Sequence, residues 1–212
     1  LMNAVYFKAL WTDPFDTLNT LESKFRLASG GYVDCGMMQK SDTLPVLRTD
    51  QFVAVQLPYG EDGFIATFML PSEESSVEKL AASLTDETWE TWSDGFTDEY
   101  VELGLPRFKF PCDISMKNVL KSMGMEVAFS NAADFSNMVT DGGVTIDDVK
   151  HKAFVQVDEL GTEAAAVTLV TIVRTSVGPG PIFNRPFLFV ISEQESGAIL
   201  FMGKIANPVW ED

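Results

Sequence analysis

The segment Glu159-Leu160-Gly161-Thr162-Glu163-Ala164-Ala165-Ala166 opens a long connection that ends at the apolar run starting with Phe187. Loops longer than about 12–15 residues without secondary structure of their own are uncommon inside compact domains and are usually functional. From Ala164 to Val173 this connection contains no charge, proline or glycine, and β-branched residues are abundant. An exposed segment of that composition is a strand without a sheet, and as a bare edge it would be an aggregation hazard. We therefore expect this connection to have a function.

Alternate side chains of the segment differ in character. Period-two alternation would place one set on a face that can be buried, while Glu163, on the other face, stays in water. Two interpretations fit this pattern: a strand that is permanently paired in a sheet, and an exposed strand that can join a sheet later. The first face would carry small or apolar residues throughout, namely Thr162, Ala164, Ala166, Thr168, Val170 and Ile172.

The rest of the chain predicts an α+β fold with mostly antiparallel sheets and a few helices. Turn residues join two pairs of apolar runs, which predicts hairpins over residues 52–70 and 186–205. Helices are predicted after the capping-box spacing Ser75 to Glu78, over residues 85–96, and from a cap at Asp113 to a stop at Gly124. Further strands are predicted over residues 2–7, over 101–110 continuing past Pro106, and over 153–157.

Composition excludes several classes of function. The 212 residues carry a formal net charge of −16, with 31 acidic residues against 15 basic ones and no basic cluster. Such a chain repels nucleic acids and anionic membranes, so neither is expected as a partner. No stretch approaches the roughly 20 uninterrupted apolar residues of a membrane span. Residues 1–10 lack the pattern of a secretion signal, and we expect the signal region to lie outside this chain.

The residues that could support catalysis are few. His151 is the only histidine, so a Ser–His or Cys–His hydrolase would have to use it, and histidine-pair metal sites are excluded by count. A lone histidine in an alternating apolar strand is more often a structural hydrogen-bonding residue. Cys35 and Cys112 stand in no metal spacing, and whether they form a disulfide stays open. The sequence predicts no enzyme activity, no cofactor and no metal.

Six motifs in series give the chain a family resemblance. Residues 159–166 resemble the hinge of inhibitory serpins, and the resemblance covers essentially the whole chain in the right order, although serpins are much longer and their N-terminal half is absent. It implies that residues 1–212 are the C-terminal portion of a single serpin domain with a reactive-centre loop at about 159–182. The other five motifs are Asn3 with Phe7-Lys8-Ala9-Leu10-Trp11 and Pro14-Phe15; Phe129 to Ser136; His151-Lys152-Ala153; Phe183-Asn184-Arg185-Pro186-Phe187; and Phe201-Met202-Gly203-Lys204-Ile205 with Asn207-Pro208.

The resemblance implies a protease inhibitor that acts as a suicide substrate. The target protease attacks a loop carbonyl and forms an acyl-enzyme, and the freed hinge then inserts into the large sheet. Asn3 and His151 would pair in the shutter of that sheet, and Trp11 would lie at the breach, where the loop first enters. The alternative is a non-inhibitory serpin with a carrier or storage role, whose hinge would carry bulky or charged inward residues. The hinge residues implied here are Glu159, Gly161, Thr162, Glu163, Ala164, Ala165 and Ala166, and no inward one is bulky or charged.

The usual family spacing, counted from Glu159 and from Phe183, places the reactive bond at Thr175–Ser176. That bond favours an elastase-like or subtilisin-like serine protease as the target, and a cysteine protease is also compatible. A loop shifted by one residue would make Arg174–Thr175 the reactive bond and the target a trypsin-like protease. Both assignments stay open. We expect the full-length protein to be a monomer, and an extracellular or cell-surface location is favoured over a cytoplasmic one.

Overall fold

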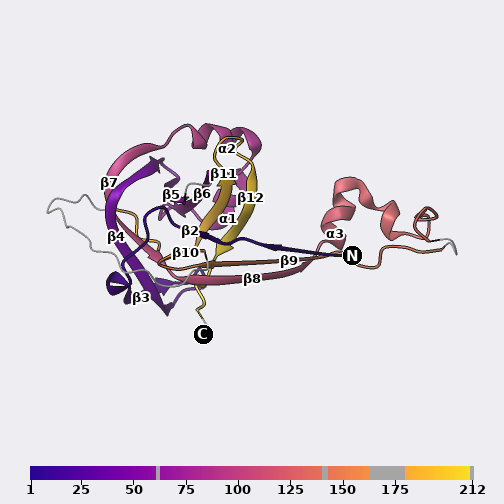
Figure 1. The fold of residues 1–212 in the computed structure, drawn as a ribbon, viewed down its shortest axis with the longest axis horizontal. Helices are drawn as coiled ribbons and strands as arrows, with labels where there is room; N and C mark the ends of the chain where they lie inside the picture. Colours follow the sequence, from indigo (N-terminus) through magenta and orange to yellow (C-terminus); the bar gives the residue numbers. More distant parts are fainter. Residues whose placement is uncertain (61–62, 140–142, 163–179, 211–212) are drawn as a thin grey trace. The chain divides into compact units, whose positions relative to one another are not determined.

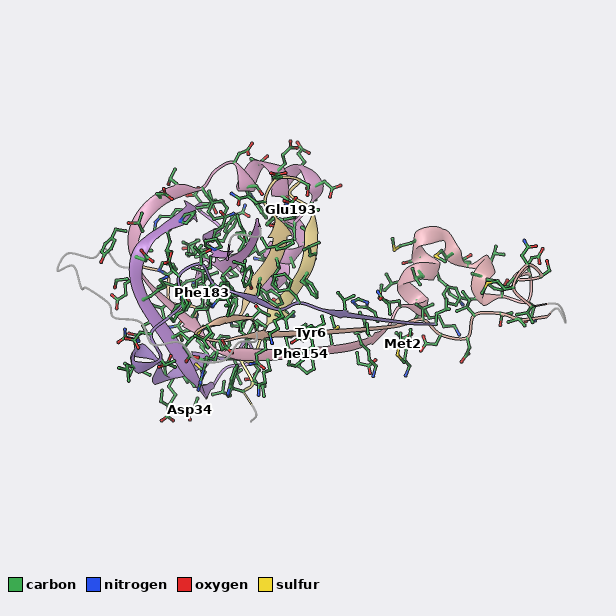
Figure 2. The ribbon with its side chains drawn as sticks, viewed as in Figure 1. Met2, Tyr6, Asp34, Phe154, Phe183 and Glu193 are labelled. Carbon is green, nitrogen blue, oxygen red and sulfur yellow. The ribbon has the colours of Figure 1, made fainter. Side chains whose placement is uncertain are left out.

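The computed structural model describes residues 1–60, 63–139, 143–162 and 180–210. These residues form two compact units, Leu1–Phe7 with Phe110–Val155 and Lys8–Lys109 with Gln156–Asp212. Figure 1 shows the elements of both, and Figure 2 adds the side chains. Each unit is described by itself below.

The larger unit is built on an antiparallel sheet of seven strands (Figure 1). Its strand order is β12-β11-β6-β5-β4-β3, and β7 pairs with β4. Both predicted hairpins are confirmed: Val55 of β5 pairs with Phe68 of β6, and Val190 of β11 pairs with Met202 of β12. The strands are β3 (Leu21–Arg26), β4 (Tyr32–Arg48), β5 (Phe52–Tyr59), β6 (Phe64–Pro71), β7 (Thr97–Pro106), β11 (Phe187–Glu193) and β12 (Ile199–Ile205).

Aromatic rings fill the core of this unit around Phe187. Its ring centroid lies 5.2 Å from that of Phe183 and 6.0 Å from that of Phe108, and both pairs meet edge to face. All three rings are fully buried, and burial of each stabilises the fold by about 1.5–3 kcal/mol. Phe183 is held further by its backbone N–H, which donates to the carbonyl of Gly104 on β7. These contacts fix the backbone that follows the long connection.

Two short helices of this unit lie where the sequence predicts them. Helix α1 (Val77–Ser83) is capped by Ser76, one residue after the predicted Ser75, and the Ser76 hydroxyl accepts a hydrogen bond from Lys79 N. Helix α2 (Asp86–Ser93) begins with a capping box between Thr85 and Thr88. The smaller element η1 (Thr17–Asn19) is a single 3₁₀ turn capped by Asp16.

The smaller unit contains most of a three-stranded sheet with the order β1-β9-β8. Strand β1 (Met2–Tyr6) runs parallel to β9 (Lys150–Val157), and β8 (Phe108–Ser115) pairs with β9. Three short helical segments follow, α3 (Lys117–Leu120), η2 (Lys121–Met125) and η3 (Val127–Phe129). In the described part of the chain, no helix is long and apolar enough to cross a membrane.

Two expectations about local structure are wrong. Asp113 does not cap a helix, because β8 continues to Ser115 and the Asp113 carboxylate pairs with Lys152 Nζ at 2.9 Å. Met116 begins the helix without a side-chain cap. The strand predicted over residues 101–110 is two strands, since β7 ends at Pro106 and β8 joins a different sheet. Proline has no N–H for a sheet ladder, which is consistent with a break at this position.

Candidate functional site

The hinge begins with a tight reversal after β9. Asp158 Oδ1 accepts hydrogen bonds from the backbone N–H groups of Leu160 (3.0 Å) and Gly161 (3.3 Å), and Asp158 N donates to the carbonyl of Gly161. Oδ2 of the same carboxylate accepts from Gln156 Nε2. The buried carboxylate is thus satisfied by three donors and turns the chain back on itself.

After this reversal the chain forms a short antiparallel ladder. Strand β10 (Gly161–Thr162) pairs with β2 (Ala9–Leu10), with Gly161 opposite Leu10 and Thr162 opposite Ala9. Gly161 has φ = 147°, and a Cβ placed there would lie 2.3 Å from the Ala9 carbonyl oxygen. Glycine is therefore required at this position, by its backbone conformation and by the closeness of β2.

Thr162 is completely buried in this ladder. Its hydroxyl is 2.9 Å from Tyr59 Oη on β5, and either oxygen can be the donor. Burial raises the pKa of Tyr59 far above its usual range, so the phenol stays neutral. The site therefore suits a small side chain with one hydroxyl. A cationic side chain at this position would find no negative charge on Tyr59.

Trp11 stacks on Tyr59 and donates two hydrogen bonds to the hinge turn. Its ring stacks on Tyr59 with centroids 4.4 Å apart and an interplanar angle of 15°. Its Nε1 donates to the carbonyl of Asp158 and its backbone N to that of Leu160, both at 2.9 Å. Phe15 N donates to the carbonyl between them, that of Glu159, at 2.7 Å. Three successive carbonyls of the hinge turn are thus bound by the segment that follows β2.

The Glu159 side chain is fixed by two further groups. Its Oε1 accepts a hydrogen bond from Thr20 Oγ1 at 2.6 Å and lies 3.7 Å from Arg107 Nη1. The Arg107 guanidinium in turn lies over the ring of Trp210, 4.9 Å from its centroid. Gly36 on β4 leaves room for this arginine, because a Cβ there would be 2.8 Å from Arg107 Nε. Arg107 links the hinge to the C-terminal segment.

The structure places the other predicted site residues as follows. Asn3 and His151 are register partners in the β1–β9 ladder, with Asn3 Nδ2 and His151 Nδ1 3.4 Å apart.

Cys35 and Cys112 are both free thiols, and burial raises the pKa of the Cys35 thiol. Among the described residues, no group of three His, Cys, Asp or Glu side chains could hold a metal ion. The predicted residues Glu163, Ala164, Ala165, Ala166, Arg174, Thr175 and Ser176 lie outside the described residues.

Sequence reasoning identified Trp11, Gly161 and Thr162 but missed their partners. Asp158 carried a weak signal, since an aspartate two or three residues before a glycine often closes a turn. Tyr59, Thr20 and Arg107 come from distant parts of the chain, so only the fold brings them to the hinge.

Comparison with known proteins gives a consistent result. The family model of the serpins, serine protease inhibitors, matches residues 1–208. Wheat Serpin-Z1A is 33% identical over 99% of this chain, and human Serpin B4 is 36% identical over 98% of it. The chain spans 56% and 55% of the lengths of these two relatives.

Solved structures agree with the sequence relatives. Human thyroxine-binding globulin, solved in complex with thyroxine, matches with a TM-score of 0.90 and 31% identity, over 99% of this chain and 56% of its own. Mouse protein-Z dependent protease inhibitor matches with a TM-score of 0.87 and 28% identity, over 98% of this chain and 55% of its own. The strand-rich α+β fold described above is therefore that of a family member: the chain belongs to the serpins.

Proposed function

We propose that the complete protein inhibits a protease as a suicide substrate, using the reactive-centre loop at about residues 159–182 as bait. The observation that supports this most is the β10–β2 ladder, in which the first hinge residues are paired antiparallel and Thr162 is fully buried. The next residues of the same face, Ala164 and Ala166, are small and uncharged, so the ladder can grow without burying a charge. Because the chain spans about 56% of its relatives' length, the proposal concerns the whole protein.

In this mechanism the protease nucleophile attacks a loop carbonyl and an acyl-enzyme forms as the peptide bond breaks. The new chain end on the hinge side is then free to extend β10. Each backbone hydrogen bond added by this extension contributes about 0.5–1.5 kcal/mol, and the small inward face is buried at the same time. The protease remains attached through its ester, or through its thioester if the nucleophile is a cysteine, and is carried along with the inserting strand.

The family spacing supports Thr175–Ser176 as the reactive bond. Thr175 has a small side chain that suits the shallow pocket of an elastase-like or subtilisin-like protease. Arg174–Thr175 is the alternative, with a trypsin-like protease as the target. We assign no catalytic role to His151, since its ring is 3.4 Å from the Asn3 amide in the β1–β9 ladder, which is the arrangement of a structural partner. The inhibitor is proposed to be monomeric and extracellular or at the cell surface.

A carrier role is the second candidate. It is favoured by the likeness to thyroxine-binding globulin, which was solved with thyroxine bound. The small inward hinge residues favour the inhibitory role instead, because insertion would meet no steric or electrostatic obstacle at these positions.

The test is to incubate the full-length protein with elastase-like, subtilisin-like and trypsin-like proteases and to look for a covalent complex on a denaturing gel. We expect a complex with one class, and mass spectrometry of the released C-terminal peptide should show that it begins at Ser176. A peptide beginning at Thr175 would assign the bait to Arg174. Cleavage by every protease without a covalent complex would contradict inhibition and favour the carrier role.

A further inference from the structure

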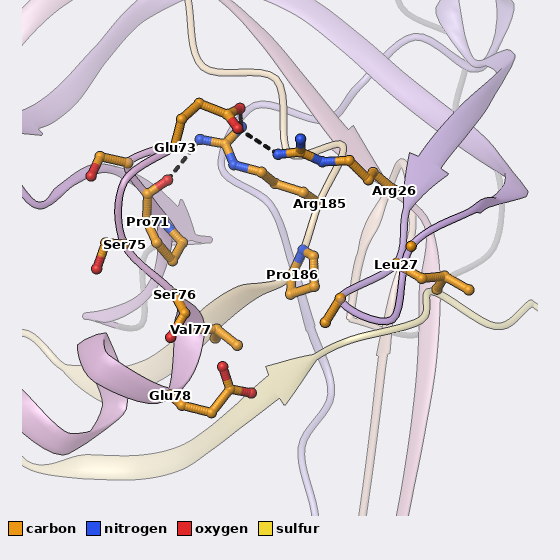
Figure 3. Close-up of a pocket in the computed structure, with 13 residues that line it drawn as sticks. Arg26, Leu27, Pro71, Glu73, Ser75, Ser76, Val77, Glu78, Arg185 and Pro186 are labelled. Carbon is orange, nitrogen blue, oxygen red and sulfur yellow. Dashed lines mark hydrogen bonds and ion pairs between the residues drawn. The ribbon is translucent and has the colours of Figure 1, made fainter.

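A cavity of about 370 Å³ lies in the larger unit, away from the hinge. It is formed by the end of β3 and its following turn, the segment after β6, the start of α1 and the residues just before β11 (Figure 3). Ligand pockets in proteins usually have volumes of about 300–1,000 Å³. The cavity is large enough for a small molecule.

Two arginines of this cavity share one carboxylate. Arg26 Nη2 is 2.6 Å from Glu73 Oε2, and Arg185 Nη1 is 3.3 Å from Glu73 Oε1 (Figure 3). Glu78 also lines the cavity, but Lys204 Nζ lies 2.9 Å from its carboxylate and neutralises it. The cavity is thus lined by two arginines and two glutamates, and Lys204 brings the number of cationic groups in these ion pairs to three against two carboxylates.

The arginines retain donor capacity. A guanidinium has five N–H donors. Beyond the contacts with Glu73, Arg185 Nη2 donates to the carbonyl of Pro71 at 2.6 Å. Burial lowers the pKa of Arg185, and the neighbouring Arg26 lowers it further against the opposing effect of Glu73. The lowered pKa of Arg185 thus reflects mainly the partial burial of its guanidinium group.

The remaining wall of the cavity is partly polar and partly apolar. It is formed by Ser72, Ser75, Ser76 and Glu78 together with Leu27, Val77 and Pro186 (Figure 3). Paired arginines bind carboxylates through short, charge-assisted hydrogen bonds, and an adjacent apolar wall stabilises the non-polar part of the same ligand.

We propose that this cavity binds a small carboxylate with an apolar tail, whose carboxylate contacts Arg26 and Arg185 and whose tail packs against Val77 and Pro186. The proposal does not depend on protease inhibition, because none of these residues belongs to the hinge or to the reactive loop.

Calorimetric titration of the full-length protein with octanoate tests this proposal. We expect saturable binding of octanoate, and binding at least about tenfold weaker for inorganic phosphate, which has no tail, and for 1-octanol, which has no charge. Absence of octanoate binding would overturn the proposal. If phosphate binds as tightly as octanoate, the apolar tail contributes nothing to binding and the proposal is wrong. If 1-octanol binds as tightly as octanoate, the carboxylate does not interact with the arginines and the proposal is also wrong.

Three variants test whether octanoate binds in this cavity. Arg26→Gln should weaken octanoate binding about tenfold, since it removes a charge-assisted contact. Glu73→Gln should tighten binding, because the competing carboxylate is gone, and this opposite sign keeps the test valid if Arg26→Gln folds poorly. Arg48→Gln, whose ion pair with Glu99 lies outside the cavity, should leave binding unchanged. Equal weakening by Arg48→Gln, or no tightening by Glu73→Gln, would overturn the assignment.

Discussion

Thr162 is the residue at which the hinge and the sheet meet. Its hydroxyl faces Tyr59 Oη at 2.9 Å in a fully buried position, and the neutral Tyr59 provides no countercharge. Any larger or charged side chain must displace the neighbouring groups or leave the ladder. A small uncharged side chain at position 162 is therefore compatible with the β10–β2 ladder.

We expect Thr162→Arg to convert the full-length protein from an inhibitor into a substrate. An arginine would place an unpaired charge in the buried β10–β2 ladder at a cost of several kcal/mol, so β10 would not be available for extension and the acyl-enzyme would be hydrolysed before insertion. Protease assays and denaturing gels should show loop cleavage without a covalent complex. Thr162→Val is the matched control, since it keeps the size and the neutral charge and removes the hydrogen bond with Tyr59, at a cost of about 1–3 kcal/mol. If Thr162→Arg inhibits as well as the parent, the insertion mechanism is wrong.

Substitution of Glu159 tests whether its side-chain contacts stabilise the hinge turn. Glu159→Gln removes its ion pair with Arg107 and weakens the hydrogen bond from Thr20. We expect the free energy of unfolding, measured by urea denaturation, to fall by about 1–2 kcal/mol. Glu74→Gln, at an exposed position, makes the same change in charge and should alter stability by less than about 0.5 kcal/mol. Equal effects of the two variants would mean that the Glu159 contacts do not stabilise the hinge.

At the scale of elements, the β10–β2 ladder depends on Gly161. Gly161→Ala would place a Cβ 2.3 Å from the Ala9 carbonyl oxygen, so the two strands must separate. We expect faster hydrogen exchange at the amides of Thr162 and of Trp11, which donates to the carbonyl of Leu160, and a loss of more than about 2 kcal/mol in stability. Gly31→Ala is the control, because Gly31 also has a positive φ of 83° but nothing within 4 Å of its added Cβ. If Gly161→Ala costs no more than Gly31→Ala, strand contact at Gly161 has no role.

The contact between α1 and β12 gives a pH-dependent test. The pKa of Glu78 is lowered, mainly by the hydrogen bond from Lys204. A carboxyl with a lowered folded-state pKa stabilises the fold above its ordinary pKa, and this contribution is lost as the pH falls through the lowered value. Lys204→Gln should therefore raise the pKa of Glu78 in an NMR titration. Glu193, whose pKa is lowered mainly by Ser196, should not change. The pair is exposed, so stability should change by less than about 1 kcal/mol.

The sequence predicted the elements whose patterns are local and missed those that depend on distant partners. The β5–β6 and β11–β12 hairpins were predicted because their alternation and turn residues lie close together in the chain. Strand β4 is the longest described strand, yet Gly36 and Pro45 interrupt its pattern, and its pairing with β3, β5 and β7 supplies the order that the sequence does not reveal. Asp113 resembled a helix cap because its pairing with Lys152 is not visible in the sequence.

The candidate site divides in the same way. Gly161, Thr162 and Trp11 lie in local motifs, and their role as site residues, implied by the resemblance, stays a prediction. Tyr59, Thr20 and Arg107 reach this segment only through the folded sheet. The reactive bond at Thr175–Ser176 lies outside the described residues and stays a prediction.

At the scale of the whole molecule, the proposed mechanism requires that the loop after Thr162 extend β10 as a new strand. The test is to cleave the full-length protein within residues 171–176 and to measure its melting temperature. We expect the melting temperature to rise by several degrees or more. The added ladder hydrogen bonds contribute about 0.5–1.5 kcal/mol each, and each kcal/mol shifts the transition of a protein longer than 250 residues by up to about 2 °C. Thr162→Arg, cleaved at the same bond, should show no rise. A parent protein whose melting temperature stays the same or falls after cleavage would contradict insertion of the loop.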